Sequence, residues 1–197
     1  EAELDRVRQT GHGRLVSMRG RRRVGKSRLV DEFLRRGAHP PVPYVFFTAS
    51  RQPLARELEL FAQDVARSEL PAAAVVKYGG VTFESWDGAL TFLATTAGGT
   101  PQVIVMDEFP YLVEQDPSLE ATLQKVWDRY LREAPVLLVL IGSDISMMSA
   151  LTSRLARSWL CSLRPSSGRR CCCSSPPRCA GSRSPTSTCS GPSPGSC

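Results

Sequence analysis

The chain has 197 residues, of which 42% are hydrophobic, and a formal net charge of +6. This length suits one domain with a sizeable core, and no apolar run reaches the 18 residues that a membrane-spanning helix needs. The charge is uneven, because residues 149–197 carry seven Arg and no acid, whereas residues 1–148 hold 18 basic and all 19 acidic residues. The first 148 residues therefore give no electrostatic reason to expect a nucleic-acid-binding protein.

The first residues lack a starting Met and do not form a signal peptide. We therefore expect a fragment or a processed chain, with a cytoplasmic location. All seven Cys lie in residues 161–197. A body without Cys is compatible with the cytosol.

The first predicted strand covers residues 14–19 and leads directly into a glycine-rich loop. This loop, Gly20–Ser27, matches the pattern G-x-x-x-x-G-K-[ST] at every fixed position. The backbone N–H groups of such a loop wrap a phosphate, and a Cβ at the glycine positions would obstruct the turn or the ligand. Lys26 can reach the β- and γ-phosphates, and the Ser27 hydroxyl can bind Mg²⁺. The predicted phosphate-binding residues are Gly20, Arg21, Arg22, Arg23, Val24, Gly25, Lys26, Ser27 and Arg28.

A helix is predicted directly after the loop, where its N-terminal dipole would face the bound anion. The side chains of Arg21–Arg23 need not face a nucleotide, and we expect them to form a solvated basic loop. The helix is indicated by apolar residues at helical spacing and by a glycine stop signal. These residues are Leu29, Val30, Phe33, Leu34 and Gly37.

The middle of the chain is predicted to hold two strands, over residues 43–48 and 102–106, and three helices. The first helix has an apolar stripe of Leu54, Leu58, Phe61, Ala62 and Val65. The second is capped by Ser85 and has a stripe of Trp86, Ala89, Leu90 and Leu93. The third starts at Asp116-Pro117 and has a stripe of Leu119, Leu123, Val126, Trp127 and Tyr130. Trp86 and Trp127 are accordingly predicted core residues.

Two acidic residues follow the apolar strand over residues 102–106. An apolar strand that ends in an acid is typical of a Walker B site, because the strand is buried and its carboxylate emerges at the edge of the sheet beside the phosphate loop. Asp107 is predicted to hold Mg²⁺, partly through water. Glu108 is predicted to polarise the attacking water as a general base. The motif gains weight from lying about 80 residues after the phosphate loop.

A fourth strand is predicted over residues 135–141, and it ends in Gly142-Ser143-Asp144. A polar side chain at this point can orient the attacking water or sense the γ-phosphate. Ser143 is the favoured residue for that role and Asp144 the less favoured one, with a turn or helix cap as the alternative. Strands that are apolar on both faces and separated by helices indicate a parallel sheet covered on both sides. The fold class is therefore α/β, in three layers.

The composition changes near Ser149. Residues 149–197 contain 14 Ser, 6 Pro, 7 Cys and 7 Arg, and after Leu163 they contain no Val, Ile, Leu, Met, Phe, Tyr or Trp, so they cannot build a core. We divide the chain into a core over 1–148 and a low-complexity tail over 149–197. Three interpretations of the tail stay open: a disordered basic tail that binds nucleic acid, a metal site at Cys171–Cys173 with Cys179, or an out-of-frame product of a GC-rich gene. The third is favoured, and the nucleotide sequence around codon 149 tests it.

Several segments together resemble the archaeal-type ATPase family, in the AAA+/STAND-like branch of P-loop ATPases. They are the loop Gly20–Ser27 and residues 44–49, 107–112 and 142–148. The resemblance implies ATP binding and hydrolysis, a sheet of order 5-1-4-3-2 and a sensor role for Ser143. It also implies that the region of Glu3 and Leu4 is an opening helix near the adenine. Members continue with a helix, an arginine-bearing loop, a fifth strand and a lid, which we expect to be missing because the pattern stops after Met148.

The leading function is therefore an ATP-binding, Mg²⁺-dependent ATPase module. The absence of a guanine-reading Asn-Lys-x-Asp segment favours ATP over GTP. The alternatives are a nucleotide-gated switch with little hydrolysis, a nucleic-acid-binding protein that acts through its tail, and a truncated non-functional product. A protein partner is unidentified, and an unpaired sheet edge would favour oligomers.

Overall fold

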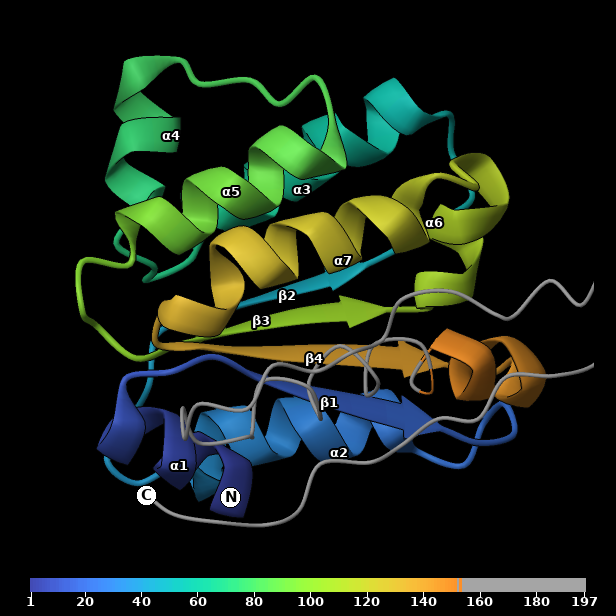
Figure 1. Cartoon of the computed structure of the whole chain (residues 1–197), viewed down its shortest axis with the longest axis horizontal. Helices are drawn as coiled ribbons and strands as arrows, with labels where there is room; N and C mark the ends of the chain where they lie inside the picture. The colour runs from blue at the N-terminus through green and yellow to red at the C-terminus, as the bar shows by residue number, and fades with distance from the viewer. Residues whose placement is uncertain (152, 154–197) are drawn as a thin grey trace, which may run out of the picture. The chain divides into compact units, whose positions relative to one another are not determined.

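The computed structural model describes residues 1–151 and 153. Four parallel strands form one sheet: β1 (Arg14–Arg19), β2 (Tyr44–Thr48), β3 (Gln102–Asp107) and β4 (Val136–Gly142). Their order is β1-β4-β3-β2 (Figure 1). This confirms the α/β class and the 1-4-3-2 part of the expected order. The fifth strand and the lid were expected to be missing, and that expectation, like most of the predicted tail over 149–197, concerns residues outside the described part.

Helices cover both faces of the sheet, as Figure 1 shows. On one face lie α1 (Ala2–Thr10), α2 (Lys26–Glu32) and a π-helical turn, η1 (Phe33–Gly37). On the other lie α3 (Leu54–Arg67), α5 (Trp86–Thr96) and α7 (Leu119–Arg129). The remaining elements are α4 (Ala73–Gly79), α6 (Phe109–Gln115) and a 3₁₀ turn, η2 (Leu131–Glu133). None of the helices among the described residues is long and apolar enough to cross a bilayer.

The strict alternation of side chains along a strand divides the core into two clusters. Val103 and Val105 of β3 pack with residues of α1 and α2, whereas Ile104 and Met106 pack with α3, α5 and α7. All residues of β3 and β4 are buried, because both strands lie inside the sheet and are covered on both faces. The three-layer arrangement thus follows from the period-two pattern of these apolar strands.

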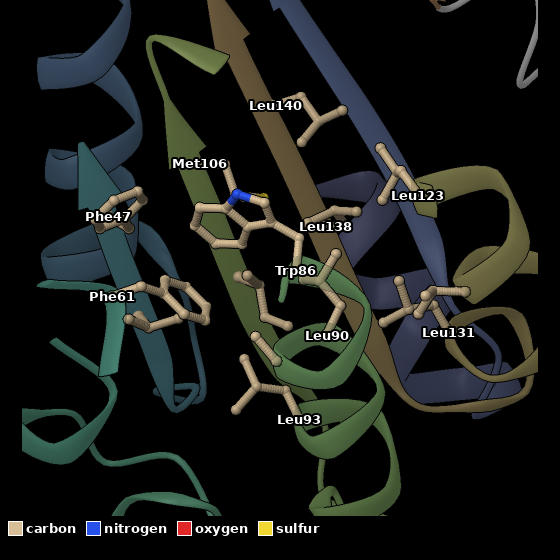
Figure 2. Close-up of a cluster of buried hydrophobic side chains, with 14 of the residues drawn as sticks. Phe47, Phe61, Trp86, Leu90, Leu93, Met106, Leu123, Leu131, Leu138 and Leu140 are labelled. Atoms are coloured by element: carbon tan, nitrogen blue, oxygen red, sulfur yellow. The ribbon is translucent and has the colours of Figure 1, made fainter. Parts of the chain in front are cut away.

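The larger cluster is built around aromatic side chains. The ring centroid of Phe61 lies 5.4 Å from that of Phe47 and 5.3 Å from that of Trp86, and all three side chains are buried. Figure 2 shows them with leucines of α5, α7 and β4. Trp127 is also buried, so both predicted core tryptophans are confirmed. The Ser85 cap is confirmed as well, since its Oγ accepts a hydrogen bond from the Gly88 N–H at 3.1 Å.

The residues after β4 continue the fold beyond Met148. Residues 145–151 are helical, and Met148 and Leu151 are both buried in the larger cluster. Asp144 caps this helix, because its Oδ1 accepts a hydrogen bond from the Met147 N–H at 2.9 Å. The predicted boundary at residue 148 therefore falls inside a helix, and the nature of the tail stays a prediction. Met148 and Leu151 are at helical spacing, but the small and polar residues around them made this short apolar pattern hard to recognise in the sequence.

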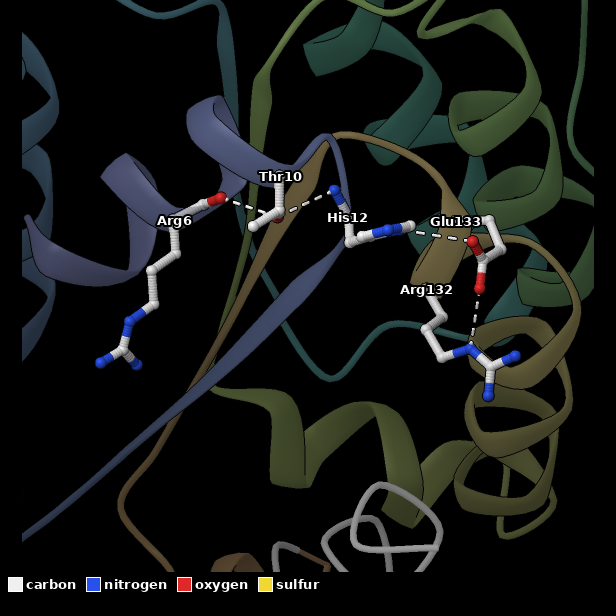
Figure 3. Close-up of polar contacts among 5 residues, drawn as sticks. All are labelled: Arg6, Thr10, His12, Arg132 and Glu133. Atoms are coloured by element: carbon white, nitrogen blue, oxygen red, sulfur yellow. Dashed lines mark hydrogen bonds and ion pairs between the residues drawn. The ribbon is translucent and has the colours of Figure 1, made fainter. Parts of the chain in front are cut away.

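Polar contacts join the turn before β1 to η2 at the end of the sheet where β1 begins (Figure 3). The Thr10 hydroxyl donates to the Arg6 carbonyl at 2.8 Å and accepts from the His12 N–H at 3.2 Å. The His12 ring then lies 3.3 Å from the Glu133 carboxylate. These contacts fix the entry of the chain into β1, from which the glycine-rich loop follows.

Asp64 on α3 gives a pH-dependent prediction. Partial burial raises its pKa above the ordinary value of 3.8, and the nearby Arg67 only partly opposes this. A raised folded-state pKa adds stability below the unfolded pKa, and this contribution is lost as pH rises through the folded value. We therefore expect Asp64→Asn to stabilise the fold at pH 7, by less than about 1 kcal/mol, with a smaller gain near pH 4. Thermal unfolding at both pH values checks this, and destabilisation at pH 7 would contradict it.

Candidate functional site

The loop Gly20–Ser27 connects β1 to α2 at the carboxyl edge of the sheet. Gly25 has φ +86°, in the left-handed region that L side chains avoid, so the second fixed glycine of the motif is required by the backbone itself. The Lys26 side chain turns back over the loop, and its Nζ donates to the carbonyls of Gly20 at 2.8 Å and Arg21 at 2.9 Å. The ammonium group is thus held by the first two residues of its own loop.

A cleft of about 170 Å³ brings the loop together with the ends of β3 and β4. Four cationic and two anionic side chains line it, which leaves an excess of positive charge. Of the residues predicted for the site, this cleft includes Arg22, Arg23, Gly25, Lys26, Ser27, Arg28, Asp107 and Glu108. Gly20, Arg21, Val24 and Ser143 do not line it. An excess of positive charge in a concave site suits an anionic ligand.

Asp107 and Glu108 occupy different environments although they are neighbours in sequence. Asp107 ends β3 and is only 5% exposed, and its Oδ1 accepts a hydrogen bond from the Glu108 N–H at 2.9 Å. Glu108 lies outside the strand, with φ +52° and ψ +39°, and α6 begins directly after it. A left-handed non-glycine residue costs on the order of 1 kcal/mol, and such residues cluster at functional sites. This turn of the backbone directs the Glu108 side chain toward the end of β4.

Ser143 meets Glu108 at the end of β4. The Ser143 Oγ donates a hydrogen bond to Glu108 Oε2 at 3.2 Å and accepts one from Arg22 Nε at 3.4 Å. Asp144 instead caps the helix that follows. Ser143 and Asp144, the two alternatives for the polar residue after the fourth strand, therefore make different contacts. Ser143 contacts the Glu108 carboxylate, and Asp144 caps a helix.

The arginines of the loop are all exposed, as expected of a solvated basic loop. Arg22 and Arg23 line the cleft, and the Arg22 guanidinium also lies 5.6 Å from the ring centroid of Tyr111 on α6. Tyr111 and its second cationic neighbour, Arg51, were not among the predicted site residues. Sequence periodicity did not reveal them because Arg51 follows a strand end, where no repeat fixes the direction of a side chain, and Tyr111 lies in α6, a helix that was not predicted.

A second, more apolar cavity adjoins the loop on its other side. Met18, Val24 and Leu29 contribute its apolar surface, and Gly25, Lys26 and Arg28 are shared with the cleft. Val24 is 63% exposed and Leu29 64%, although Leu29 was predicted to lie on the apolar stripe of its helix. Leu4 is buried under the sheet and lines neither of these two cavities.

Comparison with known proteins relates the chain to a protein family and to a curated protein. The profile of a protein family described as an ATPase domain predominantly from Archaea matches residues 2–161, which extends 13 residues past the predicted boundary at 148. A Methanocaldococcus jannaschii protein named "Uncharacterized protein MJECL04" is 26% identical over 129 residues, which make up 66% of this chain and 25% of that protein. The chain thus spans about a quarter of the length of this relative.

Proposed function

Because the chain belongs to the family of ATPase domains found predominantly in Archaea, we propose that its glycine-rich loop binds the phosphates of ATP and that the adjoining carboxylates support hydrolysis. The observation that carries the proposal is the shared cleft, which Lys26 and Ser27 line together with Asp107 and Glu108. A cation for the phosphates, oxygen ligands for a metal ion and a candidate base are thus gathered around one concave surface.

The oxygen atoms in the cleft fit a hard divalent cation. Mg²⁺ prefers carboxylate, hydroxyl and phosphate oxygens, and it takes only one or two ligands from the protein in nucleotide sites. The buried Asp107 carboxylate and the Ser27 hydroxyl are such ligands, and both line the cleft. When bound, the ion would neutralise charge on the β- and γ-phosphate oxygens. Asp107 and Ser27 are therefore the proposed metal ligands.

Glu108 is the proposed general base. Its left-handed backbone aims the side chain along the edge of the sheet, and the Ser143 hydroxyl holds one carboxylate oxygen at 3.2 Å. The other oxygen can accept a proton from a water molecule as that water attacks the γ-phosphorus. Ser143 thus fixes the orientation of the base. A role for Ser143 in contacting the nucleotide is not needed for this step.

The apolar surface beside the loop is the proposed site of the nucleobase. Val24 and Leu29 are exposed there, and the cavity shares Gly25, Lys26 and Arg28 with the cleft, so one ligand can extend from one to the other. A flat, apolar purine ring is suited to such a surface. The buried Leu4 is left without a role in base binding.

We expect Glu108→Gln to retain ATP binding within about threefold and to lower turnover by about a hundredfold or more, because the amide keeps the size of the side chain but cannot accept the proton. Steady-state phosphate release with Mg²⁺ and ATP measures the turnover. The matched control is Glu84→Gln, the same change at an exposed residue that lines neither cavity. Equal turnover in the two variants would exclude Glu108 as the base.

A further inference from the structure

Two arginines from opposite ends of the sheet edge meet at one aromatic ring. The guanidinium carbon of Arg22, in the loop after β1, lies 5.6 Å from the ring centroid of Tyr111, and that of Arg51, after β2, lies 3.9 Å from it. β1 and β2 are the outer strands of the four described. Each cation is attracted to the ring, but the two repel each other. An anion close to Arg22 would relieve what remains of that repulsion, because the Glu114 carboxylate already lies 3.6 Å from the Arg51 guanidinium.

The backbone around Arg51 is fixed by hydrogen bonds to a buried carboxylate of α3. Its φ of +61° is unusual for a residue other than glycine, and the residues on either side of it are fixed. The backbone N–H groups of Ser50 and Gln52 both donate to Oε1 of Glu57, at 2.9 and 2.8 Å, and Glu57 is buried. A buried carboxylate on α3 therefore maintains the strained turn that presents Arg51 to Tyr111.

Arg51 also has an anionic neighbour of its own. The Glu114 carboxylate of α6 lies 3.6 Å from the Arg51 guanidinium. The Arg51 charge is thus paired with Glu114, and the backbone on either side of Arg51 is bound to Glu57. The Arg51 guanidinium therefore lies over the Tyr111 ring, and the Arg22 guanidinium approaches the same ring.

Arg22 differs from Arg51 in its charge balance. Among the ion pairs of the described residues, none includes Arg22, and its polar contact is the neutral Ser143 hydroxyl. It lines the cleft with Lys26 and Ser27. Ser143 in turn donates to Glu108. The exposed Arg22 guanidinium, which has no paired anion among the described residues, therefore lies one hydroxyl away from the carboxylate that is proposed to activate water.

This position indicates which phosphate Arg22 would contact. A base that activates water must lie beside the terminal phosphate, because that is the group attacked. Arg22 shares the Ser143 hydroxyl with this base, whereas Lys26 is held over the start of the loop by the Gly20 and Arg21 carbonyls. The Arg22 guanidinium is therefore on the terminal-phosphate side of the cleft.

We propose that Arg22 binds the terminal phosphate of ATP and makes the site selective for the triphosphate over the diphosphate, with Tyr111 as the residue that positions its guanidinium. The inference rests on the proposed function, since it requires that the cleft bind nucleotide phosphates. A planar guanidinium offers two parallel N–H donors to a phosphate, which an ammonium group does not. ADP lacks the phosphate that Arg22 binds, so its affinity does not depend on Arg22.

The test compares the affinities of a non-hydrolysable ATP analogue with a β,γ-imido bridge and of ADP, each with Mg²⁺, by isothermal titration calorimetry on the full chain. Arg22→Ala is expected to weaken binding of the analogue about tenfold or more, and binding of ADP by less than about threefold. The matched control is Arg129→Ala, which removes the same charge from an exposed residue of α7 that lines neither cavity. It is expected to change both affinities by less than about threefold.

Two conservative variants separate a specific contact from general charge. Arg22→Lys keeps the charge but loses the fork, so analogue binding is expected to stay weak. Tyr111→Phe keeps the ring and is expected to retain the selectivity, whereas Tyr111→Leu is expected to lower analogue affinity and leave ADP affinity unchanged. Thermal unfolding without nucleotide confirms that each variant is folded. Loss of selectivity in Tyr111→Phe equal to that in Tyr111→Leu would overturn the positioning role.

The affinities of the unaltered chain test the proposed function, and those of Arg22→Ala test the role of Arg22. If the unaltered chain binds neither nucleotide, the proposed function is wrong and the inference falls with it. If it binds both, and Arg22→Ala weakens the two by the same factor, only the inference is overturned. Recovery of analogue affinity in Arg22→Lys would likewise overturn the bidentate contact.

Discussion

Lys26→Ala is expected to weaken the binding of both ATP and ADP by about a hundredfold or more. The Lys26 ammonium is held over the loop by two carbonyls, at 2.8 and 2.9 Å, and it is the lysine that lines the cleft. A charge-assisted hydrogen bond contributes about 1.5–3 kcal/mol, and the ammonium can make more than one to the β- and γ-phosphates. Because the β-phosphate is present in both nucleotides, the loss extends to ADP. This separates Lys26 from Arg22, whose removal affects the triphosphate alone.

Calorimetric titration with Mg²⁺ and each nucleotide measures the effect of Lys26→Ala. The control is Lys77→Ala, which removes the same side chain from α4, where Lys77 packs against the exposed ring of Tyr78. The control is expected to bind as the unaltered chain does. The stability of Lys26→Ala should change by less than about 1 kcal/mol, since the two carbonyls lie in a partly exposed loop where water replaces the lost donor. Unchanged nucleotide affinity would exclude the loop as the phosphate site.

Gly13→Ala is expected to destabilise the fold by about 3 kcal/mol or more, or to prevent folding. Gly13 is buried just before β1, where its N–H donates to the Arg132 carbonyl at 2.9 Å. A Cβ at this position would lie 2.0 Å from the Leu131 carbonyl oxygen and 2.9 Å from its carbon. Both are backbone atoms, so no side-chain rotation relieves the clash. Close approach of two backbones, and not a left-handed φ, is what requires glycine here.

Urea unfolding followed by circular dichroism measures this loss. The control is Gly88→Ala on α5, where a Cβ would meet only the Ser85 Oγ, at an ordinary 3.5 Å. Alanine in that helix is expected to leave the stability unchanged or to raise it by up to about 1 kcal/mol. If Gly13→Ala unfolds at the same urea concentration as Gly88→Ala, the approach of the β1 entry to η2 is looser than described.

The strands were predictable because each consists of a short apolar run that must be buried. The range 14–19 was predicted as it stands in β1, and the ranges 43–48, 102–106 and 135–141 each differ from the observed strand by one residue at one or both ends. The parallel arrangement followed from runs that are apolar on both faces. The helices α4, α6 and the one over residues 145–151 were not predicted. α4 is a short element without a side-chain cap, and α6 directly follows the strand-end acids, where the start signal of Pro110 was overlooked.

The candidate site was predictable as a set of residues but not as a geometry. The glycine-rich pattern identified the residues around Lys26, and the strand-end acids identified Asp107 and Glu108. The sequence did not show that Glu108 adopts a left-handed conformation, or that Arg22 reaches across the sheet edge to Tyr111. Both features depend on tertiary contacts between strand ends that are far apart in the sequence. The boundary near Ser149 was drawn from composition, which overlooked the buried Leu151.

The strand that carries the phosphate loop has its sheet partner far away along the chain. β1 pairs with β4 from Arg14↔Leu137 to Arg19↔Gly142, and with no other described strand. A ribosome delivers the N-terminal part first, so the loop and its strand emerge while their partner is still unmade. The segment that carries the glycine-rich loop is thus synthesised well before the strand that pairs with it. Until residue 142 has left the exit tunnel, β1 is an unpaired edge that a chaperone or a neighbouring nascent chain can engage.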